Sequence, residues 1–143
     1  TGDAHAQTVI KSYGDLISDT VRVVPFIEDM AAAYAWADVV ICRAGALTVS
    51  ELAVMGRPSV LVPLPHAIDD HQTANARSLA DRGGAILLPQ SDMTEDALII
   101  ALRAYMEHPE RLRTMAEAAR KAAAPEATQQ VADEVEALID AAR

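Results

Sequence analysis

Short runs of β-branched and apolar residues alternate with segments of helical length along most of this chain. The clearest runs are residues 38–42 (DVVIC), 59–62 (SVLV) and 85–88 (AILL). A strand that is covered on both faces has this continuous apolar composition. Strands that alternate with helices predict an α/β fold with a parallel sheet and right-handed crossovers. We therefore expect a Rossmann-like parallel sheet with flanking helices.

The remaining elements follow from periodicity and from the positions of proline and glycine. We expect a helix at 3–18, a strand at 21–24 closed by Pro25, and a helix capped by Asp29 that runs to Trp36. Helices are also expected at 48–55, which Gly56 ends, and at 71–82, before Gly83 and Gly84. After the last strand the sequence predicts only a helical C-terminal tail, with helices at 94–107, 109–122 and 126–142.

The segment 43–51 (RAGALTVSE) follows the strand at 38–42 directly. Its first residues after Arg43 are small, which lets a ligand approach the backbone closely. Thr48 and Glu51 have the spacing of a capping box, which predicts that the helix begins at Thr48. Unpaired amides at the start of a helix, together with the helix dipole, form a seat for phosphate or pyrophosphate. Glu51 either accepts hydrogen bonds from ribose hydroxyls or serves only as the acid of the capping box.

Ligands of parallel sheets bind beyond the carboxyl ends of the strands, so the loops 25–29, 43–48 and 63–72 are expected to line one crevice. Gln72 and Asn75 are three residues apart on one helix face, and their carboxamides suit sugar hydroxyls, which both donate and accept. Asp70 and His71 either belong to this group of polar residues or only occupy the start of the helix. Arg43 either balances a diphosphate or pairs with Asp38.

Composition excludes several classes of function. A formal net charge of −9 argues against nucleic acid as a main partner, and the chain has no polybasic patch for anionic lipid. No apolar run approaches the length of a membrane-spanning helix. The single cysteine, Cys42, is expected to be a small buried hydrophobe in a reducing compartment.

Neither metal nor cofactor is expected. His66 and His71 do not have the spacing of zinc ligands. Asp69 and Asp70 are adjacent loop carboxylates, which are solvated more often than they bind magnesium. The chain opens on Thr1 and Gly2 without an initiator methionine, and we expect it to be a fragment whose sheet has an open edge.

Four motifs in order resemble the donor domain of the MurG family, the bacterial transferases that add N-acetylglucosamine to undecaprenyl-pyrophosphoryl-muramoyl-pentapeptide. The motifs are residues 25–34 (PFIEDMAAAY), 43–51, 56–63 (GRPSVLVP) and 69–76 (DDHQTANA). The tail at 124–128 (APEAT) is similar to the kinked closing helices of that family, which would occupy about 109–143. The resemblance covers nearly the whole chain.

The resemblance implies one half of a two-domain glycosyltransferase of the GT-B architecture, residues 1–143 being a truncated UDP-sugar donor-binding domain. Phe26 and Ile27 would hold the uracil, and Met30 would pad the pocket. Ala46, Leu47 and Thr48 would face the diphosphate, with Gly45 in the same turn. Glu51 would take the ribose hydroxyls, while Gln72 and Asn75 would grip the N-acetylglucosamine beside His71.

The family transfers the sugar with inversion during peptidoglycan synthesis, in the cytoplasm at the inner face of the plasma membrane. Its acceptor site and membrane contact belong to the amino-terminal domain, which is absent here, so this chain alone is expected to be inert and its catalytic base stays unknown. Three rivals stay open: a separate UDP-N-acetylglucosamine-binding subunit that recruits a membrane-bound partner, a UDP-sugar epimerase, and a phosphate-binding module that takes no sugar.

Overall fold

The computed structural model describes residues 2–65, 70–124 and 126–141. The chain divides into two compact units, Thr1–Trp36 and Ala37–Arg143, and each is described by itself.

The first unit is helical. It contains the helix α1 (Asp3–Tyr13), the 3₁₀ turn η1 (Gly14–Leu16) and the helix α2 (Met30–Trp36). The helix predicted at 3–18 ends early because Gly14 adopts a φ of 48°, which stops the α-helical ladder. The predicted cap of α2 is confirmed: Asp29 Oδ1 accepts a hydrogen bond from the Ala32 amide at 2.8 Å.

The strand predicted at 21–24 is wrong. This segment forms no strand within the described residues. Its first residue, Val21, instead exchanges two backbone hydrogen bonds with Ser18, at 3.1 and 3.2 Å, in a tight local turn. A β-branched run becomes a strand only when another strand lies beside it to complete the ladder.

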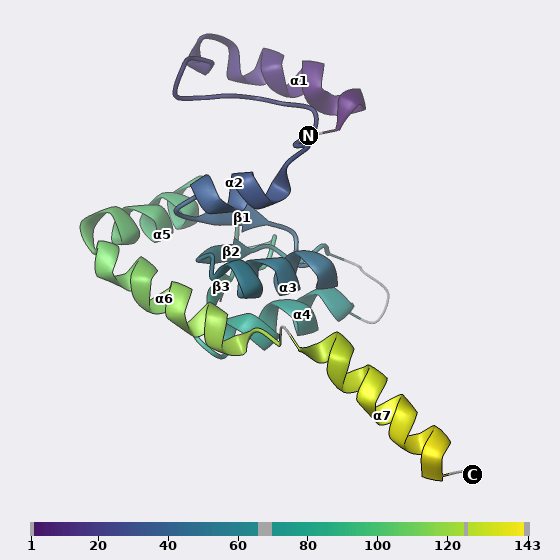
Figure 1. The fold of residues 1–143 in the computed structure, drawn as a ribbon. Helices are drawn as coiled ribbons and strands as arrows, with labels where there is room; N and C mark the ends of the chain where they lie inside the picture. The colour runs from purple at the N-terminus through teal and green to yellow at the C-terminus, as the bar shows by residue number, and fades with distance from the viewer. Residues whose placement is uncertain (1, 66–69, 125, 142–143) are drawn as a thin grey trace. The chain divides into compact units, whose positions relative to one another are not determined.

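The second unit is built on a parallel sheet of three strands in the order β1-β2-β3 (Figure 1). The strands are β1 (Val40–Cys42), β2 (Ser59–Leu61) and β3 (Ala85–Leu87). In register, Val40 pairs with Ser59 and Ser59 pairs with Ala85. The predicted Rossmann-like α/β class is therefore confirmed, and all three strands point their carboxyl ends toward one edge.

The crossover helices α3 (Ala46–Met55) and α4 (His71–Ala80) pack side by side, and α4 contacts β3. Leu52, Leu61 and Leu79 are fully buried between these elements. Each such side chain contributes about 1.5–3 kcal/mol relative to an exposed one. The core thus lies beneath the helices whose first turns border the carboxyl edge of the sheet.

Two glycines fix how these elements end and meet. Gly56 ends α3 in the left-handed conformation, with φ 59°, and Arg57 N–H bonds back to the Leu52 carbonyl at 2.9 Å, as the sequence predicts. Gly84 allows a close approach of α6, because a Cβ there would lie 2.9 Å from Ala119 Cα and 2.7 Å from Leu79 Cδ1.

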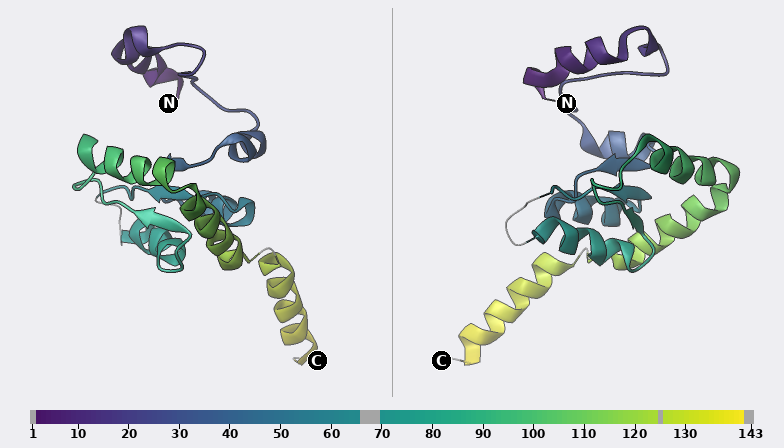
Figure 2. Two further views of the ribbon diagram at one scale, coloured as in Figure 1. Left: turned by 90° about the vertical axis from the view of Figure 1, so that its left-hand side faces the viewer. Right: turned by 180° about the vertical axis from the view of Figure 1, so that it is seen from behind.

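The tail is helical as predicted. Thr94 caps α5 (Glu95–Glu107) by accepting from the Ala97 amide at 3.1 Å, and α6 (Pro109–Ala122) begins on a proline. His108 alone separates α5 from α6, and Figure 2 shows the two helices meeting at this connection. The last helix is α7 (Ala127–Ala141). Among the described residues, none of the helices combines the length and the apolar character that crossing a bilayer requires.

Candidate functional site

The first turn of α3 differs from the capping box that the sequence predicts. Gly45, with φ −64° and ψ 146°, is the N-cap, and no side chain caps the helix. Its carbonyl accepts the Val49 amide at 3.0 Å. Thr48 therefore lies in the third helical position instead of capping the helix. Ala46 is a strong helix former and Leu47 nearly as strong, so the helix extends back to the glycine.

The earlier start of α3 still leaves the first amides of the helix available as a candidate anion seat. Within residues 2–65, 70–124 and 126–141, no hydrogen bond engages the amides of Ala46, Leu47 or Thr48. A first turn of this kind carries orphan donors and a partial positive charge. The turn is open to solvent, since the side chain of Leu47 is 81% exposed. It can therefore accept an anionic group from outside.

Glu51 stands one turn further along the exposed side of α3. It is three residues beyond Thr48 and four beyond Leu47, so the three side chains share a helix face. Because Thr48 is not the N-cap, the alternative in which Glu51 serves only as the acid of a capping box is wrong. Its carboxylate is exposed beside the amide-bearing turn.

The first turns of α4 carry Gln72 and Asn75, and both are attached to the loops that follow β1 and β2. Asn75 Nδ2 donates to the Ala44 carbonyl at 3.1 Å. The Leu64 amide donates to Gln72 Oε1 at 2.9 Å. The structure therefore brings two of the three loops expected to line one crevice, the loops after β1 and β2, together with the start of α4. Only part of each carboxamide is left for a ligand.

The N-cap of α4 is Asp70, in the left-handed conformation with φ 49°. Its Oδ1 accepts a hydrogen bond from Thr73 Oγ1 at 2.6 Å. His71, the first residue of the helix, is exposed. His66 and Asp69 lie outside the described residues. Across the part of the chain that the structure describes, His, Cys, Asp and Glu side chains do not gather into a group that could hold a metal ion.

Arg43 lies at the carboxyl end of β1. Its Nη1 donates to the carbonyls of Val62 at 3.3 Å and Pro63 at 3.1 Å, and no ion pair joins it to Asp38 in the described residues. A pocket of about 550 Å³ opens here. It is lined by Ile41, Cys42, Arg43, Val62, Gln90 and Met93. A hollow at the carboxyl ends of parallel strands is the expected place for a ligand.

Cys42 borders the same hollow. Burial raises the pKa of its thiol from 9.0 to about 11, because the thiolate is poorly solvated there. The cysteine is therefore kept as a neutral thiol, although it is half-buried and not the fully buried hydrophobe that the sequence predicts.

Phe26, Ile27 and Met30 belong to the first unit, just before α2 and at its first residue. All three are exposed, Phe26 by 76%. The other predicted site residues, from Arg43 to Asn75, all lie in the second unit.

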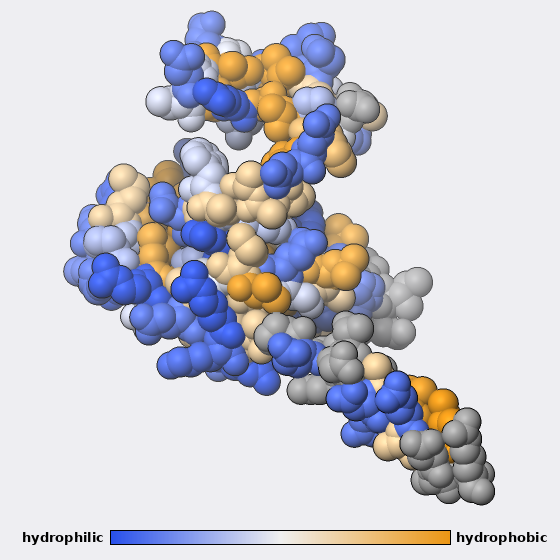
Figure 3. Space-filling model, in the orientation of Figure 1, coloured by the Kyte–Doolittle hydropathy of each residue, from blue (hydrophilic) through white to orange (hydrophobic). Residues whose placement is uncertain are grey.

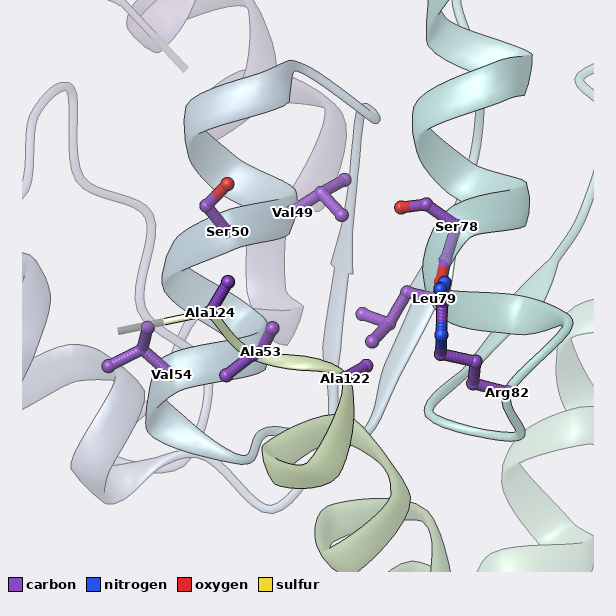
Figure 4. Close-up of a pocket in the computed structure, with 10 residues that line it drawn as sticks. Val49, Ser50, Ala53, Val54, Ser78, Leu79, Arg82, Ala122 and Ala124 are labelled. Atoms are coloured by element: carbon purple, nitrogen blue, oxygen red, sulfur yellow. The ribbon is translucent and has the colours of Figure 1, made fainter. Parts of the chain in front are cut away.

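A second hollow, of about 230 Å³, lies between α3, α4 and the end of α6 (Figure 4). Two of its polar side chains bond to backbone carbonyls of α4: Arg82 donates to the Ser78 carbonyl, and Ser78 Oγ donates to the Asn75 carbonyl at 2.7 Å. The outward face of α6 is hydrophilic, whereas apolar side chains reach the surface over α3 (Figure 3), where Leu47 and Val54 are exposed. Neither this hollow nor these surfaces of α6 and α3 bring polar groups together as the start of α3 does.

The backbone partners of the site are what sequence reasoning missed. The carbonyls of Ala44, Val62 and Pro63 and the amide of Leu64 all bind site side chains. A backbone group has no signature of its own in a sequence. The one available signal was Gly45, a residue that commonly caps helices.

Comparison with known proteins identifies the family. The family model described as the glycosyltransferase family 28 C-terminal domain matches residues 1–131. The chain is 51% identical, over 97% of its length, to a transferase from Tolumonas auensis named UDP-N-acetylglucosamine--N-acetylmuramyl-(pentapeptide) pyrophosphoryl-undecaprenol N-acetylglucosamine transferase. A protein of the same name from Azotobacter vinelandii is 62% identical over 78% of this chain.

Solved structures agree. The crystal structure of Acinetobacter baumannii MurG superposes with a TM-score of 0.84 at 48% identity, over 94% of this chain and 41% of that one. The glycosyltransferase VinC in complex with dTDP gives a TM-score of 0.66 at 25% identity, over 80% of this chain and 27% of that one. The resemblance to the MurG family is thereby confirmed.

The chain spans 39% of the Tolumonas auensis relative and 32% of the Azotobacter vinelandii one. What it shares with them is the region that the family model describes. Since that model covers most of its length, the chain belongs to the glycosyltransferase family 28 C-terminal domain family.

Proposed function

We propose that this chain is the donor-binding part of an inverting transferase that moves N-acetylglucosamine from UDP-N-acetylglucosamine to undecaprenyl-pyrophosphoryl-N-acetylmuramoyl-pentapeptide in peptidoglycan synthesis. The relatives carry the name of this activity, and the structural neighbour VinC binds a nucleoside diphosphate. The observation that carries the proposal is the uncapped first turn of α3, whose amides meet the requirement of a diphosphate seat.

The chemistry of the leaving group explains why such a seat serves catalysis. As the bond between sugar and phosphate breaks, negative charge grows on the departing UDP. The amides of Ala46, Leu47 and Thr48 are oriented before the reaction, so they stabilise this charge without reorganisation and without a metal. Gly45 keeps the approach to them open.

The other residues take the roles that the family implies. Glu51 accepts from the ribose hydroxyls, and Gln72 and Asn75 hold the sugar, with His71 beside them. Phe26 and Ile27 hold the uracil, and Met30 pads the pocket. Inversion also requires a base on the acceptor side. We assign this base, the lipid-linked acceptor and the contact with the inner face of the plasma membrane to an acceptor domain outside residues 1–143.

Calorimetric titration with UDP, UDP-N-acetylglucosamine and inorganic phosphate tests the proposal. UDP is expected to bind, and Glu51→Ala is expected to weaken it by about 1–3 kcal/mol, because a charged hydrogen bond to ribose is lost. The variant Glu107→Ala removes another exposed carboxylate, at the end of α5, and serves as the control. Phosphate that binds as tightly as UDP would point instead to a phosphate-binding module. Unchanged UDP affinity in Glu51→Ala would remove Glu51 from the site.

A further inference from the structure

The side chain of Arg43 joins the carboxyl ends of two neighbouring strands. Arg43 follows the last residue of β1, and its Nη1 donates to the carbonyls of Val62 and Pro63, at 3.3 and 3.1 Å. Val62 and Pro63 are buried and follow directly after β2. Buried carbonyls need donors, and beyond the last ladder pair the guanidinium supplies one.

The residue after Arg43 is held from the opposite direction. Ala44 is fully buried, and its carbonyl accepts a hydrogen bond from Asn75 Nδ2 on α4, at 3.1 Å. The next residue, Gly45, is the N-cap of α3. The turn 43–45 is therefore attached to the end of β2 on one side and to α4 on the other. The direction of the first amides of α3 depends on both attachments.

We propose that Arg43 is a positioning residue for the binding of UDP-N-acetylglucosamine. It fixes the turn 43–45 to the end of β2 and so aims the amides of residues 46–48, and it does not itself contact the diphosphate. A misplacement of these amides by about 1 Å is costly, because hydrogen-bond donors stabilise charge best when they are oriented in advance. The effect of Arg43 on ligand binding rests on the proposed function. The hydrogen bonds that attach Arg43 to the end of β2 are present without any ligand.

The first experiment needs no ligand. Amide resonances are recorded by ¹H–¹⁵N NMR on the full chain as Arg43→Ala and as the control Arg113→Ala, which removes the same charge from an exposed position on α6. The resonances of residues 45–48 are expected to shift in Arg43→Ala and to stay in place in Arg113→Ala. Unmoved resonances in Arg43→Ala would overturn the proposal. Should Arg43→Ala fail to fold, Arg43→Lys replaces it, because it keeps the charge but lacks the planar fork.

The second experiment separates positioning from direct contact. Arg43→Ala is expected to weaken UDP binding about 10-fold, a loss typical of hydrogen bonds made by a charged group. Its affinity should decline with salt as steeply as that of the wild type, since no charge contact with the ligand has been lost. A shallower salt dependence would show direct contact and overturn the proposal. Failure of the wild type to bind UDP would count against the proposed function, and the resonance test would still decide the role of Arg43.

Discussion

At the scale of single residues, the two carboxamides of α4 present opposite polarities. Gln72 uses its oxygen to accept from the Leu64 amide, which leaves its NH₂ group to donate. Asn75 uses its NH₂ group to donate to the Ala44 carbonyl, which leaves its oxygen to accept. A sugar hydroxyl can both accept and donate, so the pair is matched to neighbouring hydroxyls.

Isosteric acid substitutions should therefore act differently at these two residues. Asn75→Asp places a carboxylate oxygen against the Ala44 carbonyl and is expected to lower the free energy of unfolding by about 1–3 kcal/mol. Gln72→Glu keeps an acceptor for the Leu64 amide and should leave this free energy nearly unchanged. Urea denaturation of both variants measures the difference. Equal destabilisation would contradict the orientations described.

The thiol of Cys42 should respond to pH as a poorly solvated group does, although the residue is only half-buried. With its pKa raised to about 11, it carries roughly 100-fold less thiolate at pH 8 than a thiol of pKa 9.0. Alkylation by iodoacetamide, followed by mass spectrometry, is expected to be correspondingly slow in the folded protein and fast in urea. The folded state holds this proton more tightly, so the contribution to stability is present below pH 9 and falls as the pH rises from about 9 to 11. Equal alkylation rates in both states would disprove the burial.

At the scale of elements, the start of α3 holds a conflict between stability and binding. Gly45 has backbone angles that any residue can adopt, and a Cβ there would lie 3.8 Å from Thr48 Oγ1, an ordinary contact. A capping side chain would thus fit, yet it would occupy the amides that we assign to the diphosphate. The absence of such a side chain is what leaves the first turn open.

Gly45→Asp tests this conflict. The carboxylate is expected to cap α3 and raise the free energy of unfolding by about 0.5–1 kcal/mol. It should also weaken UDP binding more than 10-fold, because it competes for the same amides and repels the diphosphate. Gly45→Ala adds no acceptor and is the control for both measurements. If Gly45→Asp bound UDP as tightly as the wild type, the seat would lie elsewhere.

The sequence predicts elements well where their signals are local. Pro109 marks the first residue of α6 correctly, and Gly56 marks the end of α3. It misplaces the start of α3, because Thr48 and Glu51 have the spacing of a capping box although the N-cap is Gly45. It also misassigns residues 21–24, because a strand requires a neighbouring strand, and a short run of valines carries no information about its neighbours.

At the scale of the whole molecule, the site could be predicted only in part. Motif similarity marks Glu51, Gln72 and Asn75, and the structure places all three on α3 and α4 in one unit. The role of Arg43 could not be read from the sequence, because its partners are the carbonyls of Val62 and Pro63, some 20 positions away. Contacts to backbone depend on the fold and not on the identity of the partner residue.

Ligand binding should be visible in the stability of the chain as a whole. A ligand that binds only the folded state at 100 times its Kd adds about 2.7 kcal/mol to the free energy of unfolding. For a chain of this size we expect UDP to raise the Tm by roughly 5–10 °C, as measured by calorimetry. Uridine, which lacks the diphosphate, is the matched ligand and should raise it much less. A Tm that does not move at saturating UDP would contradict donor binding by this chain.

The order β1-β2-β3 has a consequence for how the protein is made. Strands that touch are also successive along the polypeptide, each separated from the next by one helix. Such a sheet can form in the order of synthesis, because the neighbour of each new strand has already left the ribosome. Nascent chains of this region therefore need no distant partner sequence to begin acquiring their native pairing.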